Sequence, residues 1–337
     1  MKKNISYIIL IYFITRSTFV GISFLTQSTL TGQNAWLSVL LGFIIGFIPI
    51  TIIYKIAKYK PELNIIEKIN YLFPKTNKII KTILFLTYFL FAIITFWNLT
   101  NLANTQFLNK TPLFVISISF IIPIIYLLSK NNKIILRVGV ILFFISVFLF
   151  LVSFVGLTNK IKIYNLFPIE YNPFKGIIPY LSYNVLPIFV ILLFPNDKVY
   201  KSIYKGYIFS FLFIFIATFL TISVLGNKFT MLLQYPELFI LKHAFQHVLT
   251  FRLEHFLIIQ WVLDMFMFIS LCIKFCSDSF KIKNIFILPI IILFTNNFIF
   301  KSTMIENNLI INLFPNVFFI SLSTIILLIY IKSKKVN

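Results

Sequence analysis

Ten long apolar runs constrain this sequence more than any other feature. A helix that crosses the hydrocarbon core of a bilayer, roughly 30 Å thick, needs about 20 predominantly apolar residues. Runs of this order, separated by polar or basic clusters, have approximate limits of 5–24, 35–54, 79–100, 112–129, 134–157, 176–194, 207–225, 256–275, 285–300 and 309–331. The sequence therefore predicts an all-α integral membrane protein of about ten transmembrane helices, with residues 1–337 forming one polytopic membrane domain.

The composition excludes the soluble enzyme class. The chain is 59% hydrophobic and only 12% charged, whereas a soluble domain carries about 25% charged residues. Thirty basic residues stand against nine acidic ones, for a net charge of +21. In a soluble protein such an excess suggests nucleic acid, but in a hydrophobic chain it is typical of basic loops beside a membrane. We therefore expect membrane lipid, and no nucleic acid, among the partners.

The distribution of the basic residues predicts the topology, because cytoplasmic loops retain Lys and Arg. With both termini in the cytoplasm, 21 of the 30 basic residues fall on the inner side and 8 on the outer side. The remaining basic residue, Arg16, falls in the middle of a span. This asymmetry indicates an even number of spans with cytoplasmic N and C termini.

Two of the loops are predicted to contain amphipathic helices. Residues 55–78 contain a Pro-Glu pair followed by regularly spaced apolar residues. We expect a helix on the inner surface there, with its lysines toward anionic lipid. A second amphipathic stretch begins at Tyr235-Pro236-Glu237 on the predicted outer side.

Two charged residues lie where charge is costly. Arg16 falls in the middle of the first span and Asp264 in the eighth, and a charge at such a depth must face protein or water. One interpretation is a charge pair that belongs to a substrate site or a proton relay. The alternatives are a purely structural pair, or positions nearer the interface than the span limits imply.

Polar and small residues interrupt the first and sixth spans. Hydroxyl side chains and Gly allow a transmembrane helix to unwind, because the freed backbone groups find new partners. Paired interruptions in two halves are typical of inverted-repeat transporters with a binding site at the midplane, although a Pro kink or a Ser/Thr packing face would also explain each one alone. The residues concerned are Thr15, Arg16, Ser17, Thr18 and Gly21 in the first span, and Pro179, Ser182, Tyr183, Asn184 and Pro187 in the sixth.

Motifs for catalysis, metals and cofactors are missing from the sequence. It contains no Gly-rich phosphate loop, no HExxH and no nucleophile elbow, so we predict neither enzymatic activity nor a cofactor. His243 and His247 are four residues apart but lack an acidic or Cys partner at ligand spacing, and we predict no metal site. Cys272 and Cys276 share one helix face and do not form a disulfide framework.

Several segments, taken in order, resemble one family over nearly the whole chain. They are GQNAWLSVLLGFIIG from Gly32 to Gly46, Lys110-Thr111-Pro112-Leu113, Asn165-Leu166-Phe167-Pro168, Tyr235-Pro236-Glu237-Leu238, Phe251-Arg252-Leu253-Glu254 and Trp261-Val262. Their residues and spacing are similar to the spore germination permease family, the B-type subunit of nutrient germinant receptors, within the amino acid/polyamine/organocation superfamily.

The resemblance implies a fold and a site. The fold is a bundle of five-plus-five inverted repeats, with a ligand site between broken helices 1 and 6 and flanking helices 3 and 8. It also implies a bacterial membrane location, the spore inner membrane, beside an A-type subunit and a lipoprotein C-type subunit, where members sense small germinants, mainly amino acids.

The leading hypothesis is a germination receptor subunit that binds an amino acid. Half-helix N-termini at the breaks would hold the ligand's carboxylate, and Arg16 would either bind that carboxylate or neutralise Asp264. The candidate ligand-binding residues are Thr15, Arg16, Ser17, Thr18, Gly21, Ser182, Tyr183 and Asn184. The alternatives are a proton-coupled secondary transporter of amino acids or related solutes, with Asp264 as the relay, and a structural scaffold without a ligand.

Overall fold

The computed structural model describes residues 3–167, 169, 171–244, 254–300 and 303–336, and the regular structure in these residues is entirely helical. The α-helices are α1 (Lys3–Ser17), α2 (Phe24–Thr31), α3 (Ala35–Lys58), α4 (Ile65–Leu72), α5 (Asn77–Gln106), α6 (Leu113–Leu128), α7 (Asn132–Leu157), α8 (Ile177–Tyr180), α9 (Asp197–Leu232), α10 (Pro236–Ala244), α11 (Glu254–Phe280), α12 (Ile287–Phe294), α13 (Thr303–Asn308) and α14 (Phe314–Val336).

Shorter turns of tighter or wider pitch connect these helices. The 3₁₀ turns are η2 (Gly32–Asn34), η3 (Thr158–Lys160), η4 (Ile163–Leu166), η5 (Pro173–Gly176) and η7 (Leu186–Leu193). The π turns are η1 (Phe19–Ser23), η6 (Leu181–Val185), η8 (Thr295–Ile299) and η9 (Leu309–Leu313). Several of them stand inside expected spans, where they change the helical pitch without ending the span.

Seven helical stretches among the described residues are long and apolar enough to cross a membrane. The first, Ile5–Lys58, is 54 residues long and turns at Gly32, whose φ is +54°. The others are Asn77–Gln106, Asn132–Val152, Pro173–Leu193, Asp197–Gly226, Ile258–Phe280 and Thr303–Val336. Two shorter apolar helices, Leu113–Leu128 and Ile287–Ile299, coincide with the fourth and ninth expected spans. The all-helical membrane class is confirmed.

Helix α9 begins before the seventh expected span. The span was expected from residue 207, and α9 begins at Asp197, where the Asn196 side chain caps it by accepting a hydrogen bond from the backbone N–H of Lys198 at 2.9 Å. Lysines on the first turns of α9 keep those turns polar without interrupting the helix. The helix thus extends through residues that the charge pattern assigned to a loop.

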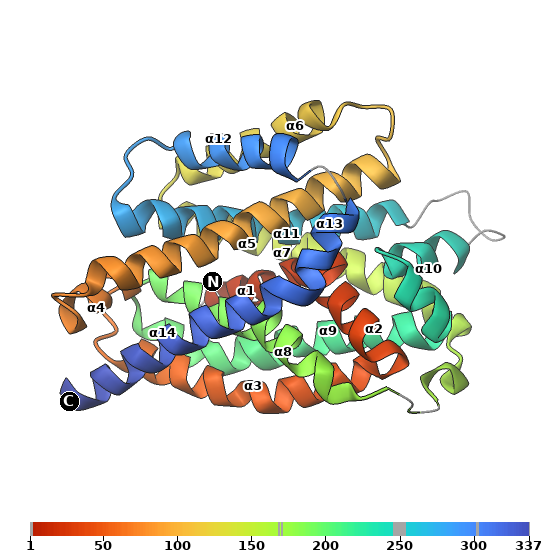
Figure 1. Ribbon diagram of the computed structural model, residues 1–337, viewed down its shortest axis with the longest axis horizontal. Helices are drawn as coiled ribbons and strands as arrows, with labels where there is room; N and C mark the ends of the chain where they lie inside the picture. Colours follow the sequence, from red (N-terminus) through yellow and green to blue (C-terminus); the bar gives the residue numbers. More distant parts are fainter. Residues whose placement is uncertain (1–2, 168, 170, 245–253, 301–302, 337) are drawn as a thin grey trace.

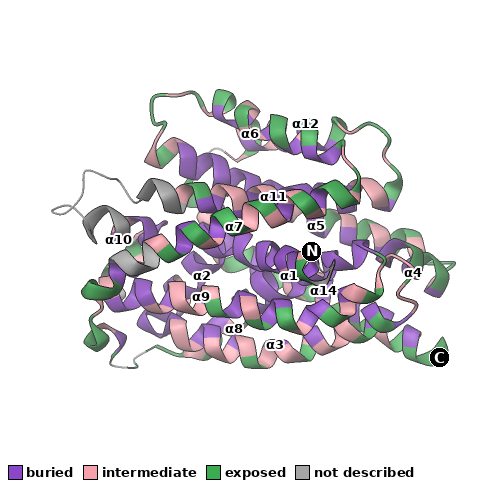
Figure 2. Cartoon of the chain, turned by 180° about the vertical axis from the view of Figure 1, so that it is seen from behind, coloured by how far each residue is buried: buried purple, intermediate pink, exposed green. Residues whose placement is uncertain are grey.

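The helices are arranged around α1. In Figure 1, α6 and α12 lie side by side at one edge of the bundle against α5 and α11, while α3 and α9 lie at the opposite edge. The cartoon coloured by burial, seen from behind, shows α1 as buried, whereas the outer helices carry exposed residues along their length (Figure 2). Many exposed side chains are large and apolar, including Ile48, Tyr126 and Phe148, as expected of a surface that faces lipid. A charge on α1 therefore lies at the centre of the bundle.

The amphipathic helix expected within residues 55–78 is α4. A capping box starts it: the Asn64 side chain accepts from the N–H of Glu67 at 2.9 Å, and the Glu67 carboxylate accepts from the N–H of Asn64 at 2.8 Å. The expectation that its lysines face lipid is wrong for Lys68, which is only 2% exposed. Its ammonium group donates to the carbonyls of Ile56 and Ala57 at 2.9 and 3.2 Å. Burial lowers the pKa of Lys68 to about 8.

Candidate functional site

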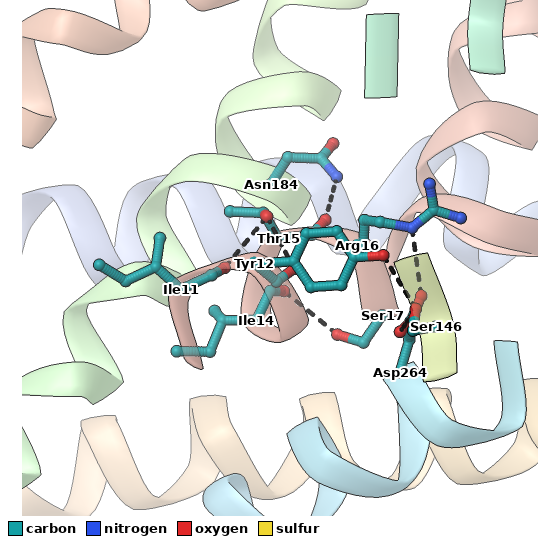
Figure 3. A network of polar contacts seen from close by, with 9 residues as sticks. All are labelled: Ile11, Tyr12, Ile14, Thr15, Arg16, Ser17, Ser146, Asn184 and Asp264. Atoms are coloured by element: carbon teal, nitrogen blue, oxygen red, sulfur yellow. Dashed lines mark hydrogen bonds and ion pairs between the residues drawn. The ribbon is translucent and has the colours of Figure 1, made fainter. Parts of the chain in front are cut away.

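A buried ion pair joins the two charged residues singled out in the sequence. The Arg16 Nε donates to the Asp264 Oδ2 at 3.1 Å, and the two residues are 2% and 1% exposed. The second carboxylate oxygen of Asp264 accepts from the Ser146 hydroxyl at 2.9 Å, and Ser146 in turn lies 2.9 Å from the Tyr12 hydroxyl (Figure 3). Helices α1, α7 and α11 thus meet at one carboxylate.

The ion pair leaves part of the Arg16 guanidinium group unused. Nη1 is buried and has no hydrogen-bond partner among the described residues, and Figure 3 shows the terminal nitrogens pointing away from Asp264. The guanidinium carbon lies 5.9 Å from the ring centroid of Tyr12 and 5.2 Å from that of Phe150. These rings stabilise the cation through their π faces, but they do not replace a hydrogen-bond acceptor. One donor of Arg16 is therefore left without an acceptor in this part of the structure.

The first span is interrupted directly after Arg16, as its polar residues predict. Val20 has extended geometry (φ −74°, ψ 128°) and Gly21 is left-handed (φ +69°, ψ −4°). The carbonyl of Val20, freed from the helix, accepts from the Asn98 side-chain amide at 2.7 Å. The Thr18 hydroxyl donates to the carbonyl of Tyr183 at 2.6 Å. Side chains from α5 and contacts with the sixth span thus stabilise the break.

Gly21 permits a close approach that no other residue allows. A Cβ at this position would lie 2.4 Å from the Asn98 Oδ1 and 2.6 Å from the Tyr235 Cε1. The Tyr235 hydroxyl lies 3.0 Å from the Asn98 Oδ1 and accepts from the Asn101 amide at 3.2 Å. The segment between α9 and α10 therefore packs directly on the break in the first span.

The sixth span differs from the expected interruption. It does not unwind: α8 passes into the π turn η6 and then into the 3₁₀ turn η7 without leaving helical backbone geometry. Pro187, which lacks a backbone N–H, stands at the start of η7. The span therefore changes pitch where the sequence predicted a break.

The polar residues of the sixth span face different neighbours. The Asn184 amide donates to the carbonyl of Thr15 at 2.8 Å, which brings this residue to α1. The Ser182 hydroxyl donates to the carbonyl of Pro315 at 2.7 Å, and the Tyr183 hydroxyl donates to that of Ile310, also at 2.7 Å. Two of the three expected ligand-binding side chains are thus directed toward the last span.

Within α1, two further candidate residues bond to their own helix. The Thr15 hydroxyl donates to the carbonyls of Ile11 and Tyr12 at 3.1 and 3.0 Å, and the Ser17 hydroxyl donates to that of Ile14 at 3.1 Å (Figure 3). Such back-bonding occupies the hydroxyl hydrogen and favours a bend. In this conformation both residues shape the helix end beside Arg16.

Glu237 is a candidate that the sequence reasoning missed. It stands in the first turn of α10 and is 7% exposed, and neither carboxylate oxygen has a hydrogen-bond partner within the part of the chain that the structure describes. Burial raises its pKa to about 7, while the positive charge of Arg16 acts in the opposite direction. The available signal was its place in the segment Tyr235-Pro236-Glu237-Leu238, which supports both the predicted outer amphipathic stretch and the family resemblance, but neither of these predicts that the carboxylate is buried.

The raised pKa of Glu237 predicts a pH-dependent stability. In the folded chain its carboxyl keeps a proton to about pH 7, whereas in the unfolded chain it loses that proton near its ordinary pKa. The folded state therefore binds more protons between these values, and its stability falls as the pH rises from about 4.5 to 7, by about 3 kcal/mol in total. Thermal unfolding of the purified protein at pH 5 and pH 8 measures this difference.

Glu237→Gln should reduce the difference between pH 5 and pH 8, because the amide does not titrate. The matched control is Glu62→Gln, since Glu62 is exposed and its replacement should leave the pH dependence intact. A Glu237→Gln variant with the full dependence of the natural sequence would contradict the assignment.

The described residues contain no group of three or more His, Cys, Asp or Glu side chains that could hold a metal ion. His247 and the side chain of His243 lie outside the described residues. Cys272 and Cys276 are buried free thiols. The prediction for the cysteines is confirmed.

Apolar helices packed around a buried ion pair define this chain as an integral membrane protein. The sequence profile of the spore germination protein family matches residues 4–295, and the chain belongs to this family. YfkT of Bacillus subtilis (strain 168), which carries the provisional name of a spore germination protein, is 30% identical over 209 residues. That match covers 59% of this chain and 56% of YfkT. The family resemblance is thereby confirmed.

Proposed function

We propose that this protein is a germination receptor subunit that resembles an amino acid permease and binds a small germinant, an amino acid, within the membrane. The observation that carries the proposal is the buried Arg16 guanidinium, with one nitrogen unpartnered, next to the break at Val20 and Gly21. A cation and a helix break together suit the carboxylate of an amino acid.

The unpartnered Glu237 carboxylate supports the same ligand class. An amino acid at neutral pH carries an ammonium group as well as a carboxylate. Glu237 and Arg16 interact electrostatically, so the two ends of a zwitterion would meet opposite charges. Binding would remove the cost of burying Glu237 without a partner, because buried charges are stabilised when they are paired and hydrogen-bonded.

We further propose ten transmembrane helices in five-plus-five inverted repeats within one membrane domain, residues 1–337. Ile5–Lys58 contains 54 residues, more than twice what one crossing requires, and its turn at Gly32 separates two crossings. The two shorter apolar helices, α6 and α12, then supply the fourth and ninth. We place the end of the bundle that carries α4 and the C terminus (Figure 1) at the cytoplasmic side, because basic residues favour that side of a membrane. The opposite end, which carries α10, then faces outward.

The proposed setting is the spore inner membrane, with an A-type subunit and a lipoprotein C-type subunit as partners. Membership of the spore germination protein family supports this setting. In such a complex a ligand that pairs with Arg16 and Glu237 would fix α10 against α1. The changed position of α10 at the surface would pass the signal to a neighbouring subunit.

Arg16→Lys tests the site, because lysine keeps the charge beside Asp264 but loses the guanidinium fork. We expect spores with this variant to need an amino-acid germinant concentration about tenfold to a hundredfold higher, as for a lost hydrogen bond to a charged group. Germination across an amino-acid panel, at equal protein level, is the measurement.

Arg137→Ala is the matched control for Arg16→Lys, because Arg137 is exposed on α7 and its loss should leave the response unchanged. Arg16→Ala extends the series by removing the charge as well. An unchanged response of both Arg16 variants would remove Arg16 from the site.

The second candidate is a proton-coupled secondary transporter of amino acids or related small solutes. A buried Glu237 whose pKa is raised to about 7 favours it, because a relay must gain and lose a proton near neutral pH. Asp264 would be the second relay group. Uptake by liposomes under an imposed pH gradient separates the two functions: turnover supports transport, and binding without turnover supports a sensor.

A further inference from the structure

A cavity lies where the C-terminal ends of α3 and α14 meet. It has a volume of about 430 Å³. Both helices end there with basic residues in their last turns. Its lining residues include Lys55, Lys58, Tyr59, Lys60, Tyr330 and Lys334. The lining thus contains four ammonium groups and no carboxylate.

Lys55, Lys58 and Lys334 are exposed and therefore solvated, but four positive charges around one cavity still attract an anion to it. The free backbone carbonyls at the C-terminal end of a helix attract cations and could offset part of this charge. At the end of α3, however, Lys68 already binds the carbonyls of Ile56 and Ala57. Glu62 interacts with Lys60 electrostatically but is not part of the cavity lining. The cavity therefore retains a net positive charge.

The Tyr59 hydroxyl indicates which kind of anion suits this cavity. Tyr59 is one of the lining residues and is 8% exposed, and its hydroxyl oxygen is buried without a hydrogen-bond partner among the described residues. Buried polar groups are nearly always hydrogen-bonded, so this hydroxyl requires an acceptor. A phosphoryl oxygen accepts hydrogen bonds from both hydroxyl and ammonium groups, which matches the lining.

Neighbouring contacts hold two of the lysines at the cavity wall. The Lys55 ammonium donates to the Tyr330 hydroxyl at 3.3 Å and lies 5.4 Å from its ring centroid. Lys60 has a left-handed backbone (φ +42°), unusual for a residue with a side chain, and its ammonium lies 3.5 Å from the Tyr71 ring centroid. The cations are therefore partly ordered before any anion binds.

We propose that this cavity binds a phosphate group, supplied by the headgroup of an anionic lipid or by free phosphate. The site lies at the end of the bundle that carries α4 and the C terminus (Figure 1). Basic pockets between transmembrane helices at the cytoplasmic surface are suited to anionic headgroups. Binding would fasten the end of α14 to the end of α3, independently of any ligand at Arg16.

The experiment uses the full-length protein, delipidated in detergent, with three probes: phosphatidylglycerol, phosphatidylcholine and inorganic phosphate. Native mass spectrometry measures retained lipid, and a thermal-shift titration measures phosphate. We expect phosphatidylglycerol to be retained in preference to phosphatidylcholine, and Lys55→Gln/Lys334→Gln to weaken its binding about tenfold or more. Tyr59→Phe, which removes only the hydroxyl, should weaken it about threefold to tenfold.

Lys201→Gln/Lys205→Gln is the matched control, since it removes two exposed lysines from α9 and should leave binding unchanged. If inorganic phosphate displaces phosphatidylglycerol as effectively as the lipid binds, the site belongs to free phosphate. If phosphate does not change how much lipid is retained, the site belongs to a lipid headgroup. Equal losses in the two double variants, or no binding of any anionic probe, would overturn the proposal.

Discussion

Asp264→Ala is expected to lower the free energy of unfolding by about 3–5 kcal/mol, because it leaves the Arg16 guanidinium buried without its carboxylate. The change also removes the acceptor of the Ser146 hydroxyl bond, so a second buried polar group loses a partner. Denaturant titration in detergent micelles measures the loss.

A second ion pair on the same helix supplies the control. Lys274 and Asp278 lie 3.2 Å apart, with side chains 23% and 35% exposed. Exposed pairs of this spacing contribute about 0.3–0.5 kcal/mol, so Asp278→Ala should change the stability little. Equal losses for Asp264→Ala and Asp278→Ala would contradict the distinction between a buried pair and a surface pair.

A double variant separates the structural role of the ion pair from its role in ligand binding. Replacing a buried pair by apolar residues of similar volume is often neutral or stabilising, so Arg16→Met/Asp264→Leu should recover most of the stability that Asp264→Ala loses. It should still fail to respond to an amino acid. A stable double variant with a normal response would show that the pair serves the fold alone.

The sequence singled out Arg16 and Asp264 and offered an ion pair as one interpretation, because burying charge in lipid is so costly that few arrangements are possible; the structure shows that they pair. Arg16 and Asp264 were each confined to the middle of an apolar run, and opposite charges at such depth pair with each other. Glu237 escaped the same reasoning because it stands in a loop, where a carboxylate is normally solvated. Its burial depends on how α10 packs over the break, a tertiary contact without a local signal.

The two interrupted spans also differ in how far their local sequence predicts their structure. Gly21 adopts a positive φ that Gly alone reaches without cost, so the unwinding of the first span follows from its local sequence. In the sixth span, the Ser182 and Tyr183 hydroxyls bond to carbonyls at Pro315 and Ile310. These contacts, formed across more than 120 residues of sequence, could not be read from the interrupted span itself.

Gly21→Ala is the second variant expected to have a large effect, a loss of about 2–4 kcal/mol in the free energy of unfolding. A left-handed backbone costs a residue with a Cβ about 1–2 kcal/mol, and the added methyl group would overlap the Asn98 and Tyr235 side chains, at a further cost of about 1–3 kcal/mol. These two side chains are bonded to each other, so neither moves without breaking that bond. Denaturant titration in detergent micelles measures the effect.

Gly139→Ala on α7 is the control for Gly21→Ala, because the nearest atom to its added Cβ is the flexible end of Met267 at 3.2 Å. Alanine in a helix interior is favoured over glycine by about 0.5–1 kcal/mol, so this variant should be as stable as the natural sequence or more so. A double-mutant cycle then isolates the overlap. If the methyl group destabilises by displacing Asn98, Gly21→Ala/Asn98→Ala should be more stable than the sum of its two single changes predicts, by about 1 kcal/mol or more. Simple additivity would show that displacement of Asn98 contributes nothing, and would leave the cost to the backbone conformation and to the overlap with Tyr235.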